Sequence, residues 1–440
     1  MENIYKLIKN KILQDNLMKK IIKNSGIILF GNSAASALNI ISFTITANQL
    51  GPESLAVLVL AQTYALIMND IFNIQTWETM IKFGSDAFND SRIADIIKTN
   101  FFLDLGSAII AFTFALLFVI PITSFLGWDQ RYINVIAIYS ITILFNITTF
   151  TIGIPRLYDK FVAIAKIQVI TALLKFGCIL YAWYSSKTMF FYINIFLIFD
   201  VLTNLLLITF SSMLLNKKIG TNWWKNKIKI DRDQIRFIWW TNLRTIIRIP
   251  VRHFDMIVIS SVMSIKMVGV YKVYKEIAGL LNRLGDPVNQ SIYPEFTKLL
   301  GHSDIATTSS VAKKTMLLLC GFSAFITLLV MVMSKYIIEM FFGVEYLVDI
   351  NALYLILGLY GISFITVPIN SLFIAAGFVR YTFLIVLFTN SIYLLTAFTC
   401  GKSFGLYGIV IAYAVQLFFN KALKIFLLKK YSGDWGSTIR

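Results

Sequence analysis

Three arginines recur every four residues in an otherwise apolar stretch of the chain. Arg244, Arg248 and Arg252 lie within segment 237–263, which reads FIWWTNLRTIIRIPVRHFDMIVISSVM. On a helix, this spacing places the three guanidinium groups on one face. An arginine at the centre of a bilayer costs at least about 2.5 kcal/mol, so a stripe of three cannot face lipid. The stripe must face protein or water, and it predicts a guest that carries negative charge.

A second polar stripe follows in segment 267–297, where charged and amide side chains recur every three or four residues on one helix face. Together the two segments hold six cations and three carboxylates, Asp255, Glu276 and Asp286. Asp255 and Asp286 are spaced to pair with the arginine three residues before each. Pairing leaves a cationic surplus, and guanidinium groups suit phosphate oxygens. We therefore expect an anion to bind Arg244, Arg248, Arg252, Lys272, Lys275 and Arg283.

Polar residues form similar stripes on the first two predicted spans of each half. One interpretation is that these stripes line a common water-filled cavity. The alternative is that they form hydrogen-bonded faces between packed helices. The residues expected to line the cavity are Asn39, Gln62, Asp70, Asn73, Asn282 and Asn289. Coupling to a proton or sodium ion could involve Asp70, Asp255 or Asp286, and the sequence does not rank them.

The elements that must position these residues are transmembrane helices. The chain is 57% hydrophobic and only 14% charged, whereas soluble domains carry about a quarter charged residues. Apolar runs of about twenty residues recur along it, as expected for membrane spans. Twelve spans are predicted, near residues 25–49, 54–79, 99–121, 132–154, 161–184, 189–215, 236–262, 267–297, 314–337, 347–374, 379–400 and 404–428.

The pattern of spans repeats at an offset of about 215 residues. Segment 132–145 matches 346–359, and segment 192–206 matches 407–423. Six spans is an even number, so both halves enter the membrane from the same side. The fold class is therefore an all-α polytopic membrane protein of two parallel-repeat six-helix bundles around a central cavity. The predicted divisions are 1–24 (basic amphipathic N-terminus), 25–216 (first bundle), 217–235 (basic linker), 236–428 (second bundle) and 429–440 (tail).

Lysine and arginine determine the expected orientation. Most of them, including Lys421 and Lys424, fall on the side that holds both termini, so that side is predicted to be cytoplasmic. The net charge of +17 could otherwise indicate a nucleic-acid partner. We exclude that class because the positive charge lies in loops beside hydrophobic spans. The three cysteines and two histidines do not cluster, so no metal site is expected.

Prolines interrupt two of the polar spans. Pro250 lies in span 236–262 and Pro287 in span 267–297. Each removes a backbone hydrogen bond and can kink its helix. They are predicted to act as hinges during alternating access, with static kinks as the alternative. Two other charges inside apolar spans, Lys175 and Asp200, are interpreted as a structural pair.

The segment LGPESLAVLVLAQTYALIMNDIFNIQTWETMIKFG (50–84) carries a resemblance to a known family. It resembles the Leu-Gly-Pro-Glu opening, the alanine-glutamine stretch and the Phe-Asn-x-Gln-x-Trp run of lipopolysaccharide O-antigen flippases. These form part of the polysaccharide-exporter branch of the multidrug/oligosaccharidyl-lipid/polysaccharide (MOP) transporter superfamily. The resemblance implies a MATE-like fold and transport of undecaprenyl-pyrophosphate-linked oligosaccharide units from the cytoplasmic to the periplasmic leaflet of the inner membrane.

Further expectations follow from that resemblance. The protein would not be an enzyme and would need no cofactor beyond a coupling ion. Its partners would be the lipid-linked substrate, membrane lipid, and an O-antigen polymerase with its chain-length regulator, and the chain is expected to act as a monomer. The alternatives are a cation-coupled multidrug or small-solute antiporter of the same superfamily, or an O-antigen polymerase. The sugar identity and the coupling ion cannot be read from the sequence.

Overall fold

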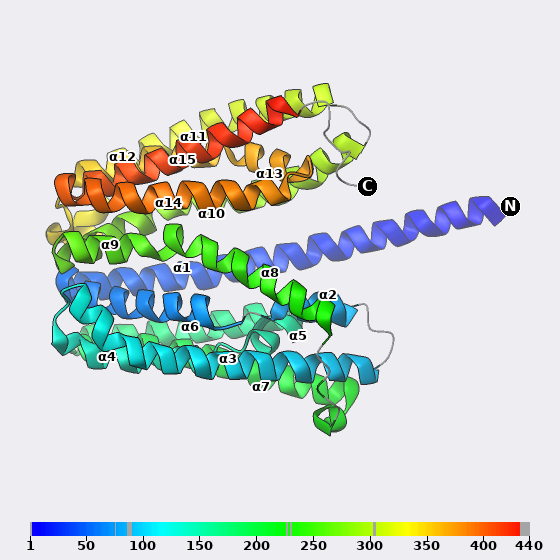
Figure 1. The fold of residues 1–440 in the computed structure, drawn as a ribbon, viewed down its shortest axis with the longest axis horizontal. Helices are drawn as coiled ribbons and strands as arrows, with labels where there is room; N and C mark the ends of the chain where they lie inside the picture. The colour runs from blue at the N-terminus through cyan, green and yellow to red at the C-terminus, as the bar shows by residue number, and fades with distance from the viewer. Residues whose placement is uncertain are drawn as a thin grey trace. The chain divides into compact units, whose positions relative to one another are not determined.

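The computed structural model describes residues 2–74, 76–85, 90–225, 228, 231–301 and 305–431. Within that part of the chain every regular element is a helix, and no strand is present (Figure 1). Helices satisfy their own backbone hydrogen bonds, as a segment in lipid requires. Side chains are described for most of these residues but not for residues 2–33 and much of 282–298. The all-helical prediction is confirmed.

The first six predicted spans correspond to α1 through α7. Span 161–184 coincides with α6, whereas α1, α3 and α7 extend beyond the predicted spans, and span 132–154 is divided into short helical pieces. In particular, α1 begins at Glu2, so the basic segment 4–22 is continuous with the first span. The bounds are α1 (Glu2–Phe72), α2 (Trp77–Ser85), α3 (Asp90–Phe125), η1 (Gln130–Tyr132), α4 (Ile133–Tyr139), η2 (Ser140–Phe145), η3 (Thr149–Gly153), α5 (Ile154–Leu157), α6 (Phe161–Tyr184) and α7 (Met189–Ile219).

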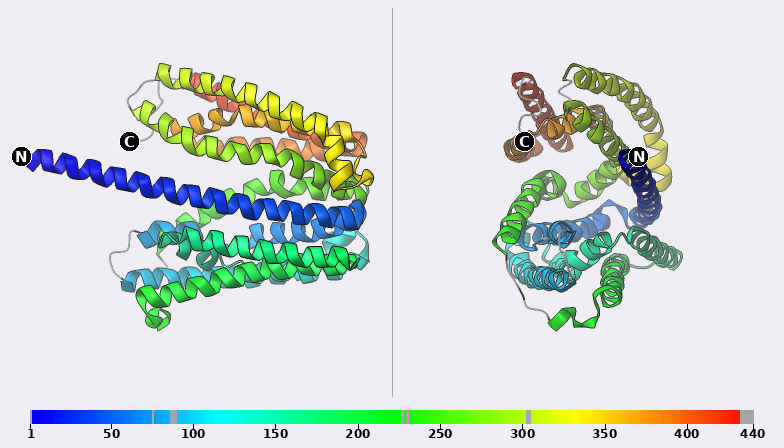
Figure 2. Two further views of the ribbon diagram at one scale, coloured as in Figure 1. Left: turned by 180° about the vertical axis from the view of Figure 1, so that it is seen from behind. Right: turned by 90° about the vertical axis from the view of Figure 1, so that its right-hand side faces the viewer.

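The last six spans correspond to α8 through α15, after a short 3₁₀ turn, η4 (Thr221–Lys225). Figure 2 shows from two sides how the long helices of this part run alongside one another. The bounds are α8 (Arg232–Ile249), η5 (Pro250–Phe254), α9 (Asp255–Val262), α10 (Ile265–Gly301), α11 (Ile305–Phe341), η6 (Val344–Tyr346), α12 (Ile350–Ile365), α13 (Val367–Ala375), α14 (Val379–Phe404) and α15 (Leu406–Lys430).

Hydropathy alone finds fewer spans than the sequence predicts. Over the described residues, eight helices are long and apolar enough to cross a membrane, or nine if the bent pair 130–145 and 149–157 is one span. One of the eight, Ala34–Phe72, is interrupted at Gly51, where φ is 69° and ψ is 171°. That left-handed φ favours glycine and divides α1 into two helical segments. The remaining two predicted spans, α8–α9 and α10, are too polar for a hydropathy criterion.

The chain forms two compact units. Unit 1 contains residues 1–49, 68–117 and 137–242, and unit 2 contains residues 50–67, 118–136 and 243–440. Each unit has an apolar core: one surrounds Met80, Phe150 and Leu215 in unit 1, and another surrounds Phe296 and Phe373 in unit 2. Residues 50–67, which the sequence places with the first bundle, therefore fall in unit 2.

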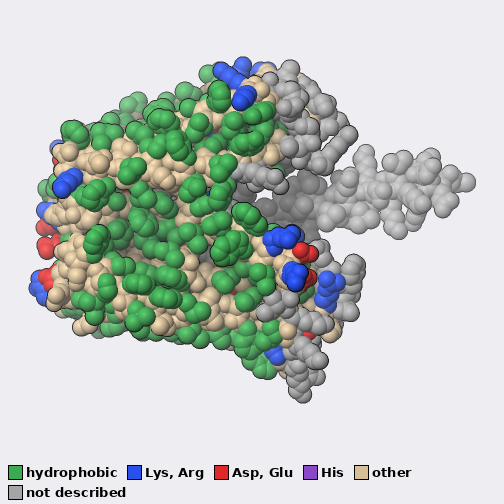
Figure 3. All heavy atoms as spheres, in the orientation of Figure 1, with side chains coloured by type: hydrophobic (Ala, Val, Ile, Leu, Met, Phe, Trp, Pro, Cys, Tyr) green, Lys and Arg blue, Asp and Glu red, His purple; other side chains and the backbone are tan. Residues whose placement is uncertain are grey.

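Apolar side chains also cover the outside of the helices. Hydrophobic residues dominate the face drawn in Figure 3, and charged side chains gather toward the ends of the helices. Leu317 and Met340 on α11 and Leu395 on α14 are 70% or more exposed. Exposed apolar surface on this scale would be costly in water and is expected in lipid. The chain is therefore a multi-pass membrane protein.

Candidate functional site

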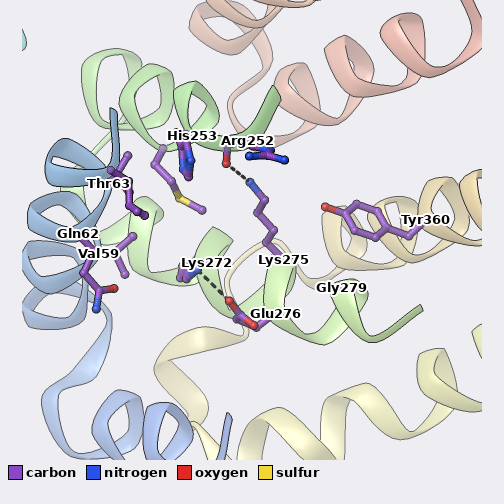
Figure 4. Close-up of a pocket in the computed structure, with 12 residues that line it drawn as sticks. Val59, Gln62, Thr63, Arg252, His253, Lys272, Lys275, Glu276, Gly279 and Tyr360 are labelled. Atoms are coloured by element: carbon purple, nitrogen blue, oxygen red, sulfur yellow. Dashed lines mark hydrogen bonds and ion pairs between the residues drawn. The ribbon is translucent and has the colours of Figure 1, made fainter. Parts of the chain in front are cut away.

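A cavity of about 300 Å³ lies within unit 2 (Figure 4). It is lined by residues of α1, of the continuous segment η5–α9, of α10 and of α12, so four segments of the chain converge on it. Most of its lining side chains carry polar groups, although membrane helices surround it. The lining residues are Val59, Gln62, Thr63, Leu66, Arg252, His253, Met256, Lys272, Lys275, Glu276, Gly279 and Tyr360.

A close crossing of α1 and α10 positions two walls of this cavity. A Cβ atom at Gly269 would overlap the backbone carbonyl of Pro52, so only glycine permits this approach. From this contact both helices run on in the direction of increasing residue number. One to four turns later, residues 59–66 of α1 and 272–279 of α10 face the same cavity. The crossing therefore fixes where Gln62 stands relative to the two lysines of α10.

Lys275 and Asp255 form the most buried ion pair of the cavity wall. Lys275 Nζ lies 2.5 Å from Asp255 Oδ2 and also donates to the Arg252 carbonyl at 3.1 Å. The Asp255 side chain is only 3% exposed, and its other oxygen accepts the backbone N–H of Met256 at 2.9 Å. Tyr271 also interacts with this carboxylate. Asp255 therefore pairs with Lys275 of the next helix, whereas the sequence spacing had suggested Arg252.

A second lysine is paired locally. Lys272 Nζ lies 2.8 Å from Glu276 Oε1, one turn along α10, and both side chains are 26% exposed. Arg252 is exposed, and its guanidinium makes no ion pair with any residue that the structure describes. The cavity wall thus holds three cations, Arg252, Lys272 and Lys275, and two carboxylates. One formal positive charge remains, and Arg252 carries it into the cavity.

The backbone around Arg252 is not a regular α-helix. Residues Pro250–Phe254 form a π-helical turn, η5, which begins at the proline. Proline has no N–H to donate and its ring displaces the carbonyl four residues earlier, which loosens the helix. Neighbouring side chains then bond the carbonyls nearby: Lys275 to Arg252, and Asn390 to Ile247 at 2.7 Å. The predicted irregularity at Pro250 is present, and Arg252 and His253 of this turn line the cavity.

Of the other predicted cations, only Arg248 has a described side chain, and it is not among the residues that line this cavity. Arg248 is exposed on α8, and its charge interacts with that of Lys424 on α15. The side chains of Arg244 and Arg283 lie outside the described residues, as do those of Asn282, Asp286, Pro287 and Asn289. The backbone of α10 runs as one helix from Ile265 to Gly301, with no break at position 287.

The predicted polar residues of the first half lie in three different environments. Gln62 lines the cavity, and Asn39 is exposed on α1. Asp70 and Asn73 are instead buried in unit 1. Asn73 donates to Asn69 Oδ1 at 2.9 Å and to the Asn146 carbonyl at 3.1 Å, and it accepts from Ser107 Oγ at 2.9 Å. Asn73 is therefore part of a hydrogen-bonded helix–helix contact.

Asp104 is at the centre of that contact, and it is not among the site residues predicted from the sequence. Its carboxylate is fully buried and accepts from Thr149 N at 2.6 Å, Thr76 N at 3.2 Å and Thr76 Oγ1 at 2.7 Å. Both threonines stand where a helix is interrupted, after Phe72 and after Phe145. Asp104 thus satisfies backbone groups at two helix breaks at once. The available signal was a lone aspartate in the apolar run FFLDLGSAII.

Lys175 and Asp200 are electrostatic partners in unit 1, as the structural interpretation predicted. Asp200 Oδ2 also accepts the Tyr139 hydroxyl at 2.6 Å. Lys175 lies 5.0 Å from the centre of the Phe196 ring. Among the residues that the structure describes, no group of His, Cys, Asp and Glu could hold a metal ion.

Comparison with known proteins identifies a family and a relative that each match more than half of the chain. The family model described as "Polysaccharide biosynthesis protein" matches residues 89–351, more than half of the length. The inner membrane protein YghQ of Escherichia coli strain K12 is 23% identical over 342 residues, which cover 76% of this chain and 95% of that protein.

Solved structures share the fold at low sequence identity. A multidrug resistance MATE family transporter of the MOP superfamily, in an inward-facing conformation, has a TM-score of 0.75 and 14% identity, covering 91% of this chain and 95% of that one. A MOP superfamily transporter from Pyrococcus furiosus, described as having a binding pocket of reverse polarity, has a TM-score of 0.57 and 14% identity, covering 93% and 96%. The MATE-like fold expected from the sequence is therefore confirmed.

Proposed function

Because this chain belongs to the family of polysaccharide biosynthesis proteins, we propose that it flips lipid-linked oligosaccharide units across the bacterial inner membrane. The substrate is an undecaprenyl-pyrophosphate-linked O-antigen unit, which moves from the cytoplasmic to the periplasmic leaflet by alternating access. Both termini lie in the cytoplasm. The family supplies the biosynthetic context, and the transporter fold supplies a means of moving a solute across a bilayer.

The observation that carries the proposal is the polarity of the cavity. Its two carboxylates are already bound by lysines, and Arg252 presents an additional cation. An arginine offers two parallel N–H donors that match a phosphate group. Gln62, Thr63 and Tyr360 add neutral hydrogen-bonding groups of the kind that bind sugar hydroxyls. The polyprenyl tail would remain in lipid beside the exposed apolar helices.

The same observation disfavours a drug/cation antiporter. A cationic guest would need a carboxylate that faces the cavity without a cationic partner. Asp255 is bound by Lys275, and Glu276 is bound by Lys272. The MATE-like fold is shared with multidrug transporters, so the fold does not separate the two functions and the charge of the cavity favours an anionic guest.

Arg252 provides the genetic test. In the source bacterium lacking this gene, lipid-linked units should accumulate on the cytoplasmic side and surface polysaccharide should be lost. R252Q should restore only about one-tenth or less of the wild-type surface polysaccharide, because a charged hydrogen bond contributes about 1.5–3 kcal/mol. R252K should be intermediate, since lysine keeps the charge and loses the planar fork.

A matched arginine outside the cavity controls this experiment. Arg131 is 81% exposed on η1 in unit 2 and pairs with Asp129 at 2.6 Å. R131Q should therefore export as well as wild type. Full export by R252Q at wild-type expression would contradict the role of the cavity. Single units attached to the lipid A core in the deletion strain would indicate a polymerase instead.

A further inference from the structure

Two lysines in the second half of α15 are buried, although the sequence places them among the positive charges of the cytoplasmic side. Lys421 is 8% exposed and Lys424 is 6% exposed. They lie nine and six residues before Lys430, where α15 ends, so they stand roughly 9–14 Å inside that end. Burial of an ammonium group costs several kcal/mol unless partners offset it.

The partners of these lysines are neutral in the part of the chain that the structure describes. Lys421 Nζ donates to the Thr366 carbonyl at 3.3 Å, at the break between α12 and α13. Lys424 Nζ donates to Asn370 Oδ1 at 2.9 Å and lies 5.9 Å from the centre of the Phe373 ring. Each ammonium has three donors and is shown with one neutral hydrogen-bond acceptor.

The neighbouring charges add to the cost. The two lysines repel each other, and Lys424 is also repelled by Arg248 on α8. Three cations from two helices thus converge with no carboxylate among the described residues paired to either lysine. The carbonyl groups at a helix break can be satisfied without a cation. Near the break between α8 and η5, the neutral amide of Asn390 donates to the Ile247 carbonyl at 2.7 Å.

We propose that Lys421, Lys424 and Arg248 form a second anion site, which binds a phosphate or pyrophosphate group. Lys421 and Lys424 supply buried donors on one face of α15, and Arg248 supplies an exposed guanidinium. Arg248 precedes Arg252 by one helical turn on the segment that leads into η5. The site therefore continues the cationic surface of the cavity, about 6 Å along the helix.

This inference rests on the proposed function, because it identifies the site as a second station for the pyrophosphate of the same substrate. Phosphate chemistry in a membrane has two sources, the headgroup of the lipid-linked oligosaccharide and that of an anionic phospholipid. The two sources can be distinguished by what the purified protein retains. A phospholipid would remain bound through purification, whereas inorganic pyrophosphate would enter an empty site.

The test uses the purified full-length protein in nanodiscs of zwitterionic lipid, titrated calorimetrically with inorganic pyrophosphate. Wild type should bind at two sites, R252Q should lose one, and K421Q/K424Q should lose the other or bind there at least tenfold more weakly. Glutamine keeps N–H donors for Thr366 and Asn370, which favours folding. If the double variant does not fold, K424Q and R248Q should each weaken the same site.

The matched control is K429Q/K430Q, which removes two exposed lysines from the end of the same helix and should bind like wild type. The experiment is repeated in nanodiscs that contain anionic phospholipid. If wild type then no longer binds pyrophosphate at the second site, and retains a phospholipid that K421Q/K424Q does not retain, the site binds a lipid headgroup. Unchanged pyrophosphate binding and unchanged lipid retention in K421Q/K424Q would overturn the proposal. If only R252Q lost pyrophosphate binding, the proposed second site would also be overturned. If only K421Q/K424Q lost binding, the second site would stand and the cavity would be excluded as a pyrophosphate site.

Discussion

Replacing Lys275 by methionine is expected to be among the most damaging single changes in unit 2. It leaves the Asp255 carboxylate, whose side chain is 3% exposed, without a cation. Removing one partner of a buried ion pair costs about 3–5 kcal/mol, and the 23% exposure of Lys275 favours the lower end. The carbonyl of Arg252 also loses a donor, so η5 should loosen. The melting temperature of the purified protein should fall by at least about 5 °C.

Two further variants separate this explanation from a general sensitivity of α10. K275M/D255N removes both charges and should recover most of the lost stability, because no unpaired carboxylate remains buried. K272M breaks the more exposed pair with Glu276 and should cost no more than about 1 kcal/mol. Equal melting temperatures of K275M and K272M would show that Asp255 does not depend on Lys275.

The second large effect is expected in unit 1, at Asp104. D104A leaves the backbone N–H groups of Thr76 and Thr149 buried without their acceptor. Each unsatisfied buried donor costs about 1–3 kcal/mol, and both helix breaks are affected together. We therefore expect D104A to lower the yield of folded protein severalfold and to lower its melting temperature more than K275M does.

Asparagine provides a graded comparison at this position. D104N keeps one oxygen acceptor, but its NH₂ group replaces the other oxygen and cannot accept a hydrogen bond. Its melting temperature should therefore lie between those of D104A and wild type. D129A removes a half-exposed aspartate that pairs with Arg131 and caps η1, and it should cost only about 1 kcal/mol. A D104A protein as stable as wild type would mean that the two breaks are held by other contacts.

The positions of the helices could be predicted from the sequence because lipid imposes a strong constraint. Long apolar runs must be helices, and the repeat helped to predict the span of α10, which hydropathy misses. Their interruptions were harder to predict. Pro250 gave a local signal, whereas the breaks after Phe72 and Phe145 contain no proline at the break. These breaks depend on a carboxylate 28 and 45 residues away, which periodicity cannot reveal.

The sequence predicted which residues line the candidate site more accurately than it predicted which residues they pair with. Arg252, Lys272, Lys275 and Gln62 do line one cavity. Asp255 pairs with Lys275 of the next helix instead of Arg252, and helix spacing within one segment cannot reveal a contact between helices. Similarly, Lys421 and Lys424 resemble interfacial lysines in the sequence, and only the packing of α15 against the α12–α13 break shows that they are buried.

The most direct test of the central claim is movement of the lipid-linked oligosaccharide in proteoliposomes containing the purified protein. A membrane-impermeant glycosidase added outside reports how many headgroups reach the outer leaflet, with a proton or sodium gradient imposed in turn. With wild type, cleavage should pass beyond the initial outer-leaflet pool and approach completion, and with R252Q it should stop near that pool. Cleavage that stops at the outer-leaflet pool with correctly folded wild-type protein, under both gradients, would contradict the account.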